Sequence, residues 1–464
     1  MTNPSVPAAR RPFGLRDKVG YMFGDFGNDF TFLLSSGFMM KFYTDVMAIP
    51  AAVVGLLMMA ARFLDAFTDV TMGQIVDRSS PTPAGKFRPW LLRMCGPVAV
   101  ASFLIYQSGF AGRSYAFRLV WMTVTYVLWG SVFYTAVNIP YGSMASAISP
   151  EPKDRSALSV WRTIGSTLAS MVIGVGTPMF AYVTVAGRTV LSGPRMTVIA
   201  GVFSLLAVVC YLICYRLVEE RVPVPRNNTR LDIGRMLRSL LSNRALLGIL
   251  AAAVLLLLAQ LGMQGMAAYV FPNFYGSASA QSLSSFTGSL AVLLICAPFA
   301  VRLSDRFGKK ELAAVSMLAG GLVYLLCLAA HPDNAYLYVA FYTAAFVGAG
   351  FFNVVIWAMI TDVIDDAELR NGVREDGTIY AVYSFARKIG QALSSGMVGG
   401  LLTMIGYSDA TAFDPAVTEG IFRLSCLVPM IGFLAVAAVL WLLYPLDRDT
   451  VRANAAELAR RRQH

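Results

Sequence analysis

Residues 245–259 are ALLGILAAAVLLLLA, and no charged side chain follows before Arg302. A helix of about 20 apolar residues is long enough to cross the ~30 Å hydrocarbon layer of a bilayer. This stretch therefore predicts a membrane-spanning helix over 244–272. Similar apolar runs recur along the whole chain and predict twelve spans, at 22–46, 52–76, 90–110, 118–147, 158–184, 195–216, 244–272, 281–303, 310–330, 336–364, 379–406 and 418–444.

The composition supports an all-α membrane protein. Of the 464 residues, 56% are hydrophobic and 14% are charged, whereas soluble domains contain about 25% charged residues. Six cysteines are scattered along the chain without a CxxC pair, and the only histidines are His331 and His464. This pattern argues against a zinc site, a disulfide framework and histidine-based catalysis. We expect no enzyme activity, no organic cofactor and no resident metal.

The distribution of Lys and Arg predicts the orientation in the membrane. Most of the 38 Lys and Arg residues fall on the connections that share a side with the N-terminus. The opposite connections carry only Arg113, Arg118, Arg188 and Arg195. Because cytoplasmic loops hold the basic excess, we expect a multi-pass protein of the plasma membrane (cell inner membrane) with both termini in the cytoplasm. The net charge of +11 then reflects topology, and no nucleic-acid partner is expected.

Two motifs repeat at about half the chain length. DRSSPTPAGKFRPW at 77–90 has a counterpart in DRFGKK at 305–310, and RTIGSTLAS from Arg162 has a counterpart in RKIGQALSS from Arg387. Transporter folds are often built from repeated halves. We expect two pseudo-symmetric six-helix bundles and a basic tail, with boundaries at 1–216 for the first bundle, 217–243 for the central cytoplasmic loop, 244–444 for the second bundle and 445–464 for the tail.

Ionisable residues inside apolar spans indicate function, because each costs at least ~2.5 kcal/mol at the middle of a bilayer. The second span contains MMAARFLDAFTDVTMG, in which Arg62, Asp65 and Asp69 share one helical face beside Thr68. Oxygen ligands of this kind suit a hard cation such as Na⁺, and a close carboxylate pair can also take up a proton. A structural ion pair of Arg62 with one carboxylate is the alternative.

Other polar residues predict where a substrate binds. In the first span, Asp29 is expected to accept hydrogen bonds from sugar hydroxyls, whereas Asp25 lies near the cytoplasmic end and is expected to be solvated. Asn138 must find a partner, although NIPYG around Pro140 could simply kink the fourth span. The eleventh span places Ser384, Lys388 and Gln391 on one face, with Tyr380, Tyr383 and Arg387 nearby.

Charged residues at the cytoplasmic ends predict a gate. The tenth span ends in an acidic cluster close to Arg370 and Arg374, and this cluster favours a salt-bridge gate over a ligand site. The expected gate residues are Asp77, Arg78, Asp305, Arg306, Asp362, Asp365 and Arg374.

The sequence resembles the glycoside-pentoside-hexuronide:cation symporters of the major facilitator superfamily. The resemblance covers nearly the whole chain and includes DKVGYMFGDFGNDF, RFLDAFTD, GKFRPW, NIPYGSMAS and REDGTIYAVYSFARKIGQAL in order. It implies the major facilitator fold with twelve transmembrane helices. It also implies a cation site at Asp65, Asp69 and Thr135, with Thr68 at a position that is asparagine in the melibiose permease of this family. Sugar contacts at Asp29 and Arg162 and a functional lysine at Lys388 are implied as well.

Two departures from the melibiose permease bear on the substrate. Asn138 stands where the permease has an aspartate that is central to galactoside binding, and Gly142 stands where it has a tryptophan that stacks on the sugar. Loss of a carboxylate removes repulsion for an anionic substrate. We therefore expect a hexuronide, a pentoside or a related glycoside. The predicted substrate-binding residues are Asp29, Asn138, Arg162, Tyr380, Ser384 and Lys388.

The resemblance implies cation-coupled symport by alternating access, and the coupling ion can be Na⁺ or H⁺. We expect a monomer in the lipid bilayer. One alternative is transport of a lysolipid or another amphiphile on the same fold. A second is a membrane enzyme, because Asp65-x3-Asp69 is similar to the Mg²⁺-binding motifs of intramembrane prenyltransferases. Those motifs lie at a cytoplasmic mouth, whereas these aspartates are expected about two turns inside the span.

Overall fold

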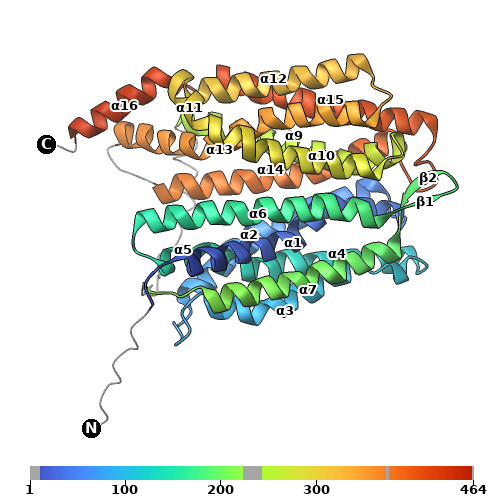
Figure 1. Ribbon diagram of the computed structural model, residues 1–464, viewed down its shortest axis with the longest axis horizontal. Helices are drawn as coiled ribbons and strands as arrows, with labels where there is room; N and C mark the ends of the chain where they lie inside the picture. Colours follow the sequence, from blue (N-terminus) through green and yellow to red (C-terminus); the bar gives the residue numbers. More distant parts are fainter. Residues whose placement is uncertain (1–10, 223–242, 372–375, 462–464) are drawn as a thin grey trace, which may run out of the picture. The chain divides into compact units, whose positions relative to one another are not determined.

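The computed structural model describes residues 11–222, 243–371 and 376–461. Within them, twelve long helical segments occupy the predicted spans (Figure 1). The first six are α1 (Leu15–Asp45), α2 (Ala51–Arg78), α3 (Arg88–Ile105), α4 (Tyr115–Val127) continued by η2 (Leu128–Tyr134) and α5 (Thr135–Ile148), α6 (Pro152–Ala181) and α7 (Gly193–Leu217). The others are α9 (Arg244–Tyr269) with η3 (Val270–Phe274), α10 (Ala278–Ala291) with η4 (Val292–Cys296) and α11 (Ala297–Phe307), α12 (Lys309–Ala330), α13 (Ala335–Asn371), α14 (Asp376–Met404) and α15 (Pro415–Leu442).

Nine of these segments, counted over the described residues, are long and apolar enough to cross a bilayer on length and composition alone. The remaining three are α1, α3 and α14. Of these, α1 carries Asp25, Asp29 and Lys41, and α14 carries Arg387 and Lys388. Polar residues inside membrane helices usually face the bundle or a water-filled path. The charged residues of α1 and α14 are therefore expected to face the interior of the protein or a water-filled path rather than lipid.

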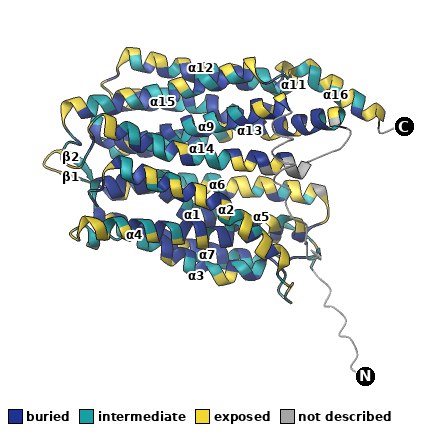
Figure 2. Ribbon diagram, turned by 180° about the vertical axis from the view of Figure 1, so that it is seen from behind, coloured by how far each residue is buried: buried dark blue, intermediate teal, exposed yellow. Residues whose placement is uncertain are grey.

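Apolar side chains also cover exposed surfaces of the helices. On α12, Val315 is 54% exposed and Leu326 is 61% exposed. Figure 2 shows such exposed residues recurring along α12 and α15 between buried ones. Apolar patches of this extent are unusual on a soluble protein and fit contact with lipid tails.

Several helices extend beyond the apolar runs that predict them. For example, α1 begins at Leu15 and α13 continues to Asn371, whereas the predicted spans begin at 22 and end at 364. Hydropathy detects only the part of a helix inside hydrocarbon, and the backbone hydrogen bonds continue into the polar interface. Beyond the twelve segments lie the short turn η1 (Ser108–Phe110) and the polar helix α16 (Arg448–Arg461).

A short β-hairpin interrupts the helical pattern between α6 and α7. Strands β1 (Tyr182–Val185) and β2 (Arg188–Leu191) pair antiparallel, with Tyr182 opposite Leu191. Ala186 and Gly187 connect them with φ of 48° and 76°. Two positive φ values match the twist of a two-residue hairpin turn, which explains why this connection does not continue α6.

The chain divides into two compact units. Unit 1 contains Met1–Ser35, Leu64–Ile173 and Gly193–Thr229, and unit 2 contains Ser36–Phe63, Gly174–Ser192 and Arg230–His464. In unit 2, helices α9, α12, α13 and α15 run side by side (Figure 1). The linker predicted at 217–243 lies mostly outside the described residues, so the predicted division into halves stays a prediction.

The beginning of α2 packs closely against α14 inside unit 2. A Cβ atom added to Gly55 would lie 2.8 Å from the Ser395 carbonyl oxygen and 3.0 Å from Gly399 Cα. The backbone N–H of Ala52 donates to Thr403 Oγ1 at 2.9 Å. Two glycines thus allow the helix backbones to approach, as small residues do at membrane helix interfaces.

In unit 1, Glu220 anchors the loop that precedes α3. Its carboxylate accepts hydrogen bonds from the backbone N–H groups of Lys86, Phe87 and Arg88 at 2.7, 2.9 and 2.7 Å. Gly85 has φ +114°, and a Cβ there would lie 2.5 Å from the Glu220 carboxyl carbon. Glu220 therefore satisfies free N–H groups at the start of a helix, where negative charge is favourable.

We expect Glu220→Gln to lower the free energy of unfolding by about 2–3 kcal/mol, because a charged acceptor of three hydrogen bonds is replaced by an amide with one acceptor. Thermal denaturation of the purified full-length protein measures the change. Glu219→Gln is the matched control, since this side chain is 32% exposed and lies 3.9 Å from Arg221. Equal melting temperatures for the two variants would contradict the anchoring role.

Candidate functional site

The two carboxylates of α2 each meet a hydroxyl group from the segment η2–α5. Ser131 Oγ donates a hydrogen bond to Asp65 Oδ1, and Thr135 Oγ1 donates to Asp69 Oδ1 at 2.8 Å. Asp65 is 7% exposed and Thr135 is 3% exposed. Because both pairs are spaced four residues apart on their helices, they form two successive contacts along one helix–helix interface.

A local change of helix type places these hydroxyls. The segment η2 is a π-helix between α4 and α5, and π-helical insertions are frequent at functional sites. Thr135 Oγ1 also donates to the Gly130 carbonyl oxygen at 3.1 Å. A Cβ added to Gly130 would lie 3.5 Å from Asp65 Oδ1. Gly130 therefore lies directly beside the Asp65 carboxylate, at a distance that would put a Cβ atom in ordinary van der Waals contact with it.

The structure brings together three of the four residues predicted for the cation site and adds the hydroxyl of Ser131 to them. Asp65, Asp69 and Thr135 lie together as oxygen-bearing groups within unit 1. The Thr68 hydroxyl donates to the Asp65 carbonyl oxygen of its own helix at 3.2 Å. Sequence reasoning missed Ser131, although its position four residues before Thr135 is the same spacing that identified the two aspartates.

A second polar group in unit 1 surrounds Arg162 of α6. Its Nε donates to Asp25 Oδ1 at 2.9 Å, and its guanidinium lies 5.5 Å from the centre of the Tyr141 ring. Asp25 is 6% exposed, so the expectation that it is solvated is wrong. The ion pair explains the burial, because a buried carboxylate needs a charged or hydrogen-bonding partner. The Arg162 side chain itself remains 45% exposed.

Asp29 lies one turn further along α1 than Asp25. Its Oδ2 atom is buried and has no hydrogen-bond partner among the residues that the structure describes. Next to it, Asn28 accepts a hydrogen bond from the Tyr211 hydroxyl at 2.8 Å, while its Nδ2 is likewise buried without a described partner. Unpaired buried polar atoms are costly, and they are the kind of atoms that a hydroxylated ligand can satisfy.

Helix α5 carries Asn138, Pro140 and Gly142, which the sequence analysis singled out. Asn138 is half-buried and Pro140 lies inside the helix. A Cβ added to Gly142 would meet no atom within 4 Å. Open space therefore exists beside Gly142 in the described structure.

In unit 2, α14 carries the remaining predicted substrate residues. Tyr380 is 51% exposed, Ser384 is exposed and Lys388 is half-buried. The Tyr380 ring stacks on Trp357 of α13 with a centroid distance of 5.4 Å. The structure thus adds a tryptophan to this face that sequence reasoning did not include.

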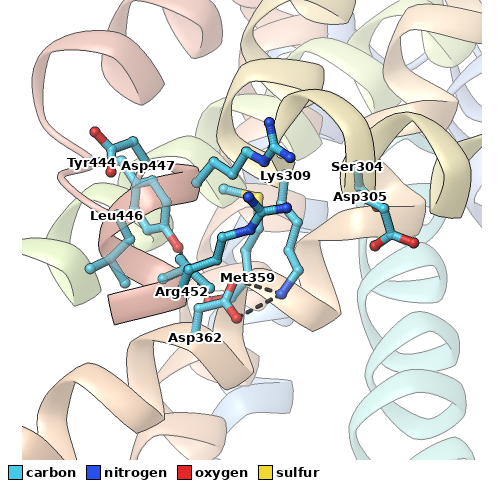
Figure 3. Close-up of a pocket in the computed structure, with 12 residues that line it drawn as sticks. Ser304, Asp305, Lys309, Met359, Asp362, Tyr444, Leu446, Asp447 and Arg452 are labelled. Atoms are coloured by element: carbon cyan, nitrogen blue, oxygen red, sulfur yellow. Dashed lines mark hydrogen bonds and ion pairs between the residues drawn. The ribbon is translucent and has the colours of Figure 1, made fainter. Parts of the chain in front are cut away.

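The predicted gate residues that the structure describes differ in their surroundings. Asp362 pairs with Lys309 at 2.6 Å and lines a cavity of about 260 Å³ in unit 2. Figure 3 shows this pair, with the Asp305 carboxylate pointing away from it.

The other predicted gate residues have different partners. The Arg306 guanidinium lies 5.2 Å from the Phe307 ring, and the Asp77 carbonyl oxygen accepts a hydrogen bond from Lys86 at 3.0 Å. Arg78 is exposed and Asp365 is half-buried, whereas Arg374 lies outside the described residues.

A buried ionic network that the sequence did not predict surrounds Lys41 in unit 2. Lys41 is 1% exposed, and its Nζ lies 2.8 Å from Asp45 Oδ2. It also donates to Asn273 Oδ1 and to the Tyr407 hydroxyl, and it lies 4.4 Å from the centre of the Tyr269 ring. The Tyr407 hydroxyl in turn donates to Asp45 Oδ1 at 2.7 Å. The i, i+4 spacing of Lys41 and Asp45 can be read from the sequence, but their partners Asn273, Tyr407 and Tyr269 are distant in the chain and cannot.

Comparison with known proteins places these features in a family. A family profile described as MFS/sugar transport protein matches residues 20–448. The chain is 32% identical to a proposed 2,3-dihydroxypropane-1-sulfonate exporter of Salmonella typhimurium, over 95% of this chain and 94% of that protein. It is 28% identical to the glucuronide carrier protein homolog of Escherichia coli, over 97% of this chain and 96% of that protein.

A solved structure supports the same fold. The crystal structure of a D-xylose-proton symporter superimposes with a TM-score of 0.61 at 13% identity, over 93% of this chain and 97% of that one. Together with the twelve long helices, the profile match establishes a multi-pass membrane protein of the major facilitator fold. The chain therefore belongs to the MFS/sugar transport protein family, and it is a secondary active transporter of the sugar and glycoside symporter class rather than an enzyme.

Proposed function

We propose that this transporter couples the binding of Na⁺ or H⁺ at Asp65 and Asp69 to the transport of a sugar or glycoside that carries an acidic group. The paired carboxylate–hydroxyl contacts between α2 and η2–α5 carry the proposal. Two carboxylates on successive turns repel each other when both are ionised. A cation or a proton relieves this repulsion and is bound more tightly for that reason. Coupling then requires that cation binding change the affinity for the substrate, while the cation gradient drives the transport.

The ligand set fits either coupling ion. Carboxylate and hydroxyl oxygens are suitable ligands for a hard cation, and the hydroxyls of Ser131 and Thr135 can turn their lone pairs toward it while their protons move to other acceptors. A proton would instead reside on one carboxyl group. The choice between the ions is a matter for experiment, and the same residues serve both cases.

The acidic substrate class has two supports. First, both relatives described above are named for anionic compounds, a sulfonate and a glucuronide. Second, Asn138 is neutral at a position where the family resemblance implies an aspartate in the melibiose permease. We propose that Asp29 and Asn138 bind sugar hydroxyls and that Arg162, already paired with Asp25, fixes the orientation of α1 and contributes positive potential.

The remaining predictions from sequence become part of this proposal. They include the cytoplasmic location of both termini, roles for Tyr380, Ser384 and Lys388 in substrate binding, a gate that includes the Asp362–Lys309 pair, and a monomeric state. In alternating access, each ligand binds more tightly when the other is bound. Such reciprocal coupling typically changes affinity by about 5- to 150-fold.

Counterflow in proteoliposomes tests the proposed function. Matched glycosides, pentosides and glucuronides are compared with and without Na⁺ at two pH values. We expect saturable, cation-stimulated exchange with a preference for acidic sugars. Exchange of a lysolipid without exchange of any sugar would favour the amphiphile alternative, and a signal independent of both Na⁺ and pH would refute coupling. In the same vesicles, Na⁺ or pH gradients imposed in either direction show whether the protein exports the substrate or takes it up.

Removal of the Ser131 or Thr135 hydroxyl tests the proposed cation site. We expect Thr135→Val and Ser131→Ala each to weaken the apparent affinity for the coupling cation by about 10-fold, because each removes one oxygen from a carboxylate-centred site. Cation titrations of counterflow measure this. Thr71→Val in α2 is the control, since the Thr71 hydroxyl donates only to the Phe67 carbonyl oxygen of its own helix in the described structure. A loss as large in Thr71→Val would assign the effect to helix packing.

A further inference from the structure

Arg387 of α14 is held against aromatic rings rather than against a carboxylate. Its guanidinium lies 5.7 Å from the centre of the Trp357 ring and 5.8 Å from that of Tyr383, and its Nη1 donates to the Tyr383 hydroxyl at 3.3 Å. Over the described ranges, no Asp or Glu forms an ion pair with it. Within the described residues, the Arg387 guanidinium is therefore positioned by aromatic rings and a hydroxyl group.

The aromatic rings form an exposed platform beside this charge. Trp357 and Tyr380 are 43% and 51% exposed and stack with an interplanar angle of 26°. Tyr383 is fully buried and meets Trp357 edge-on at 5.1 Å. The buried ring fixes the tryptophan, and the exposed rings offer the flat apolar surface on which the C–H face of a sugar can pack.

The internal repeat shows what is special about Arg387. Its counterpart in the first half is Arg162, because RKIGQALSS repeats RTIGSTLAS. Both guanidinium groups lie over an aromatic ring, but Arg162 also has Asp25 of α1 as an ion-pair partner. The first helix of the second half is α9, and it contains no acidic residue. The second predicted half therefore keeps the arginine and the ring, but its first helix offers no acidic partner in the place of Asp25.

The surroundings of Arg387 indicate a water-reached path rather than lipid. Tyr380, Ser384, Arg387, Lys388 and Gln391 have i, i+4, i+7, i+8 and i+11 spacing and share one face of α14. A guanidinium on a lipid-facing surface at membrane depth would be costly. A polar face with two cations is instead typical of a helix that lines a substrate pathway.

Resting on the proposed function, we propose that Arg387 is the residue that selects the acidic group of the transported sugar, while Trp357 and Tyr380 pack against the sugar ring. Planar guanidinium groups bind carboxylates and sulfonates through two parallel hydrogen bonds. The same residue would therefore accept the acidic group of a hexuronide or of a sulfonated sugar and would give little affinity to the neutral analogue.

Binding of matched sugar pairs to purified full-length protein tests this inference. Isothermal titration compares a glucuronide with the corresponding glucoside, and a sulfonated sugar with its neutral parent. We expect Arg387→Gln to weaken binding of the acidic member by about 10- to 100-fold and to leave the neutral member nearly unchanged. Arg387→Lys should recover part of the preference, because lysine restores the charge without the bidentate geometry.

Two further variants distinguish recognition of the acidic group by Arg387 from a general effect on binding or folding. Trp357→Ala should weaken both members of a pair alike, whereas Arg423→Gln, which removes an arginine from an exposed pair with Glu419 in the same unit, should change neither. Thermal denaturation checks that each variant is folded. Arg387→Gln that keeps the acid preference, or that weakens both members equally, would overturn the role of Arg387. A wild-type protein that binds only neutral sugars would overturn the acidic substrate class itself as well.

Discussion

Asp69→Asn should abolish cation-driven accumulation of the substrate. The asparagine side chain can still accept a hydrogen bond from Thr135, so the helix contact survives, but the second negative charge that makes cation binding favourable is lost. Proteoliposomes with an imposed Na⁺ or pH gradient measure the effect. We expect accumulation to fall to the equilibrium level, while downhill counterflow persists at a reduced rate and no longer responds to the cation.

The control for Asp69→Asn is Asp333→Asn, which makes the same charge change at an exposed loop position and should behave as the wild type. Asp65→Asn should resemble Asp69→Asn if the two carboxylates act together, with Ser131 taking the place of Thr135 as the hydroxyl partner. Normal accumulation in Asp69→Asn, with unchanged dependence on Na⁺ or pH, would exclude this carboxylate as the coupling site.

Lys41→Met should produce the largest loss of stability. The substitution keeps a side chain of similar length but leaves Asp45, which is 17% exposed, without its charged partner in a buried network. Removing one partner of a buried ion pair costs about 3–5 kcal/mol, because the remaining charge is uncompensated. The expected result is a lower melting temperature and a lower yield of monodisperse protein in detergent.

The double variant Lys41→Met/Asp45→Asn tests whether the loss of stability comes from the uncompensated charge of Asp45. When both charges are removed, most of the stability should return, since replacing a buried pair by neutral groups is often close to neutral. Arg423→Met, which breaks an exposed pair with Glu419, is the matched control and should cost less than about 1 kcal/mol. A double variant as unstable as Lys41→Met would show that the lysine acts through packing with Tyr269 rather than through its charge.

Local sequence patterns determined the elements of this protein. Apolar runs identified all twelve long helices, because hydrophobic length is a property of consecutive residues and needs no distant partner. The same reasoning placed Asp65 and Asp69 on one face of α2, since helical spacing is also local. It failed at the β1–β2 hairpin, where a two-residue turn with positive φ decided the structure, and at helix ends, which hydropathy does not mark.

Tertiary structure decided which polar groups meet. The hydroxyls of Ser131 and Thr135 reach carboxylates 66 positions away in sequence, Arg162 selects Asp25 at a separation of 137, and Lys41 finds Asn273 at a separation of 232. The burial of Asp25 could not be predicted from its place near a helix end, because its exposure depends on a partner from another helix. A charge inside a membrane protein is stable only beside its partner, so the sequence fixes the charges that must be matched and the fold chooses their partners.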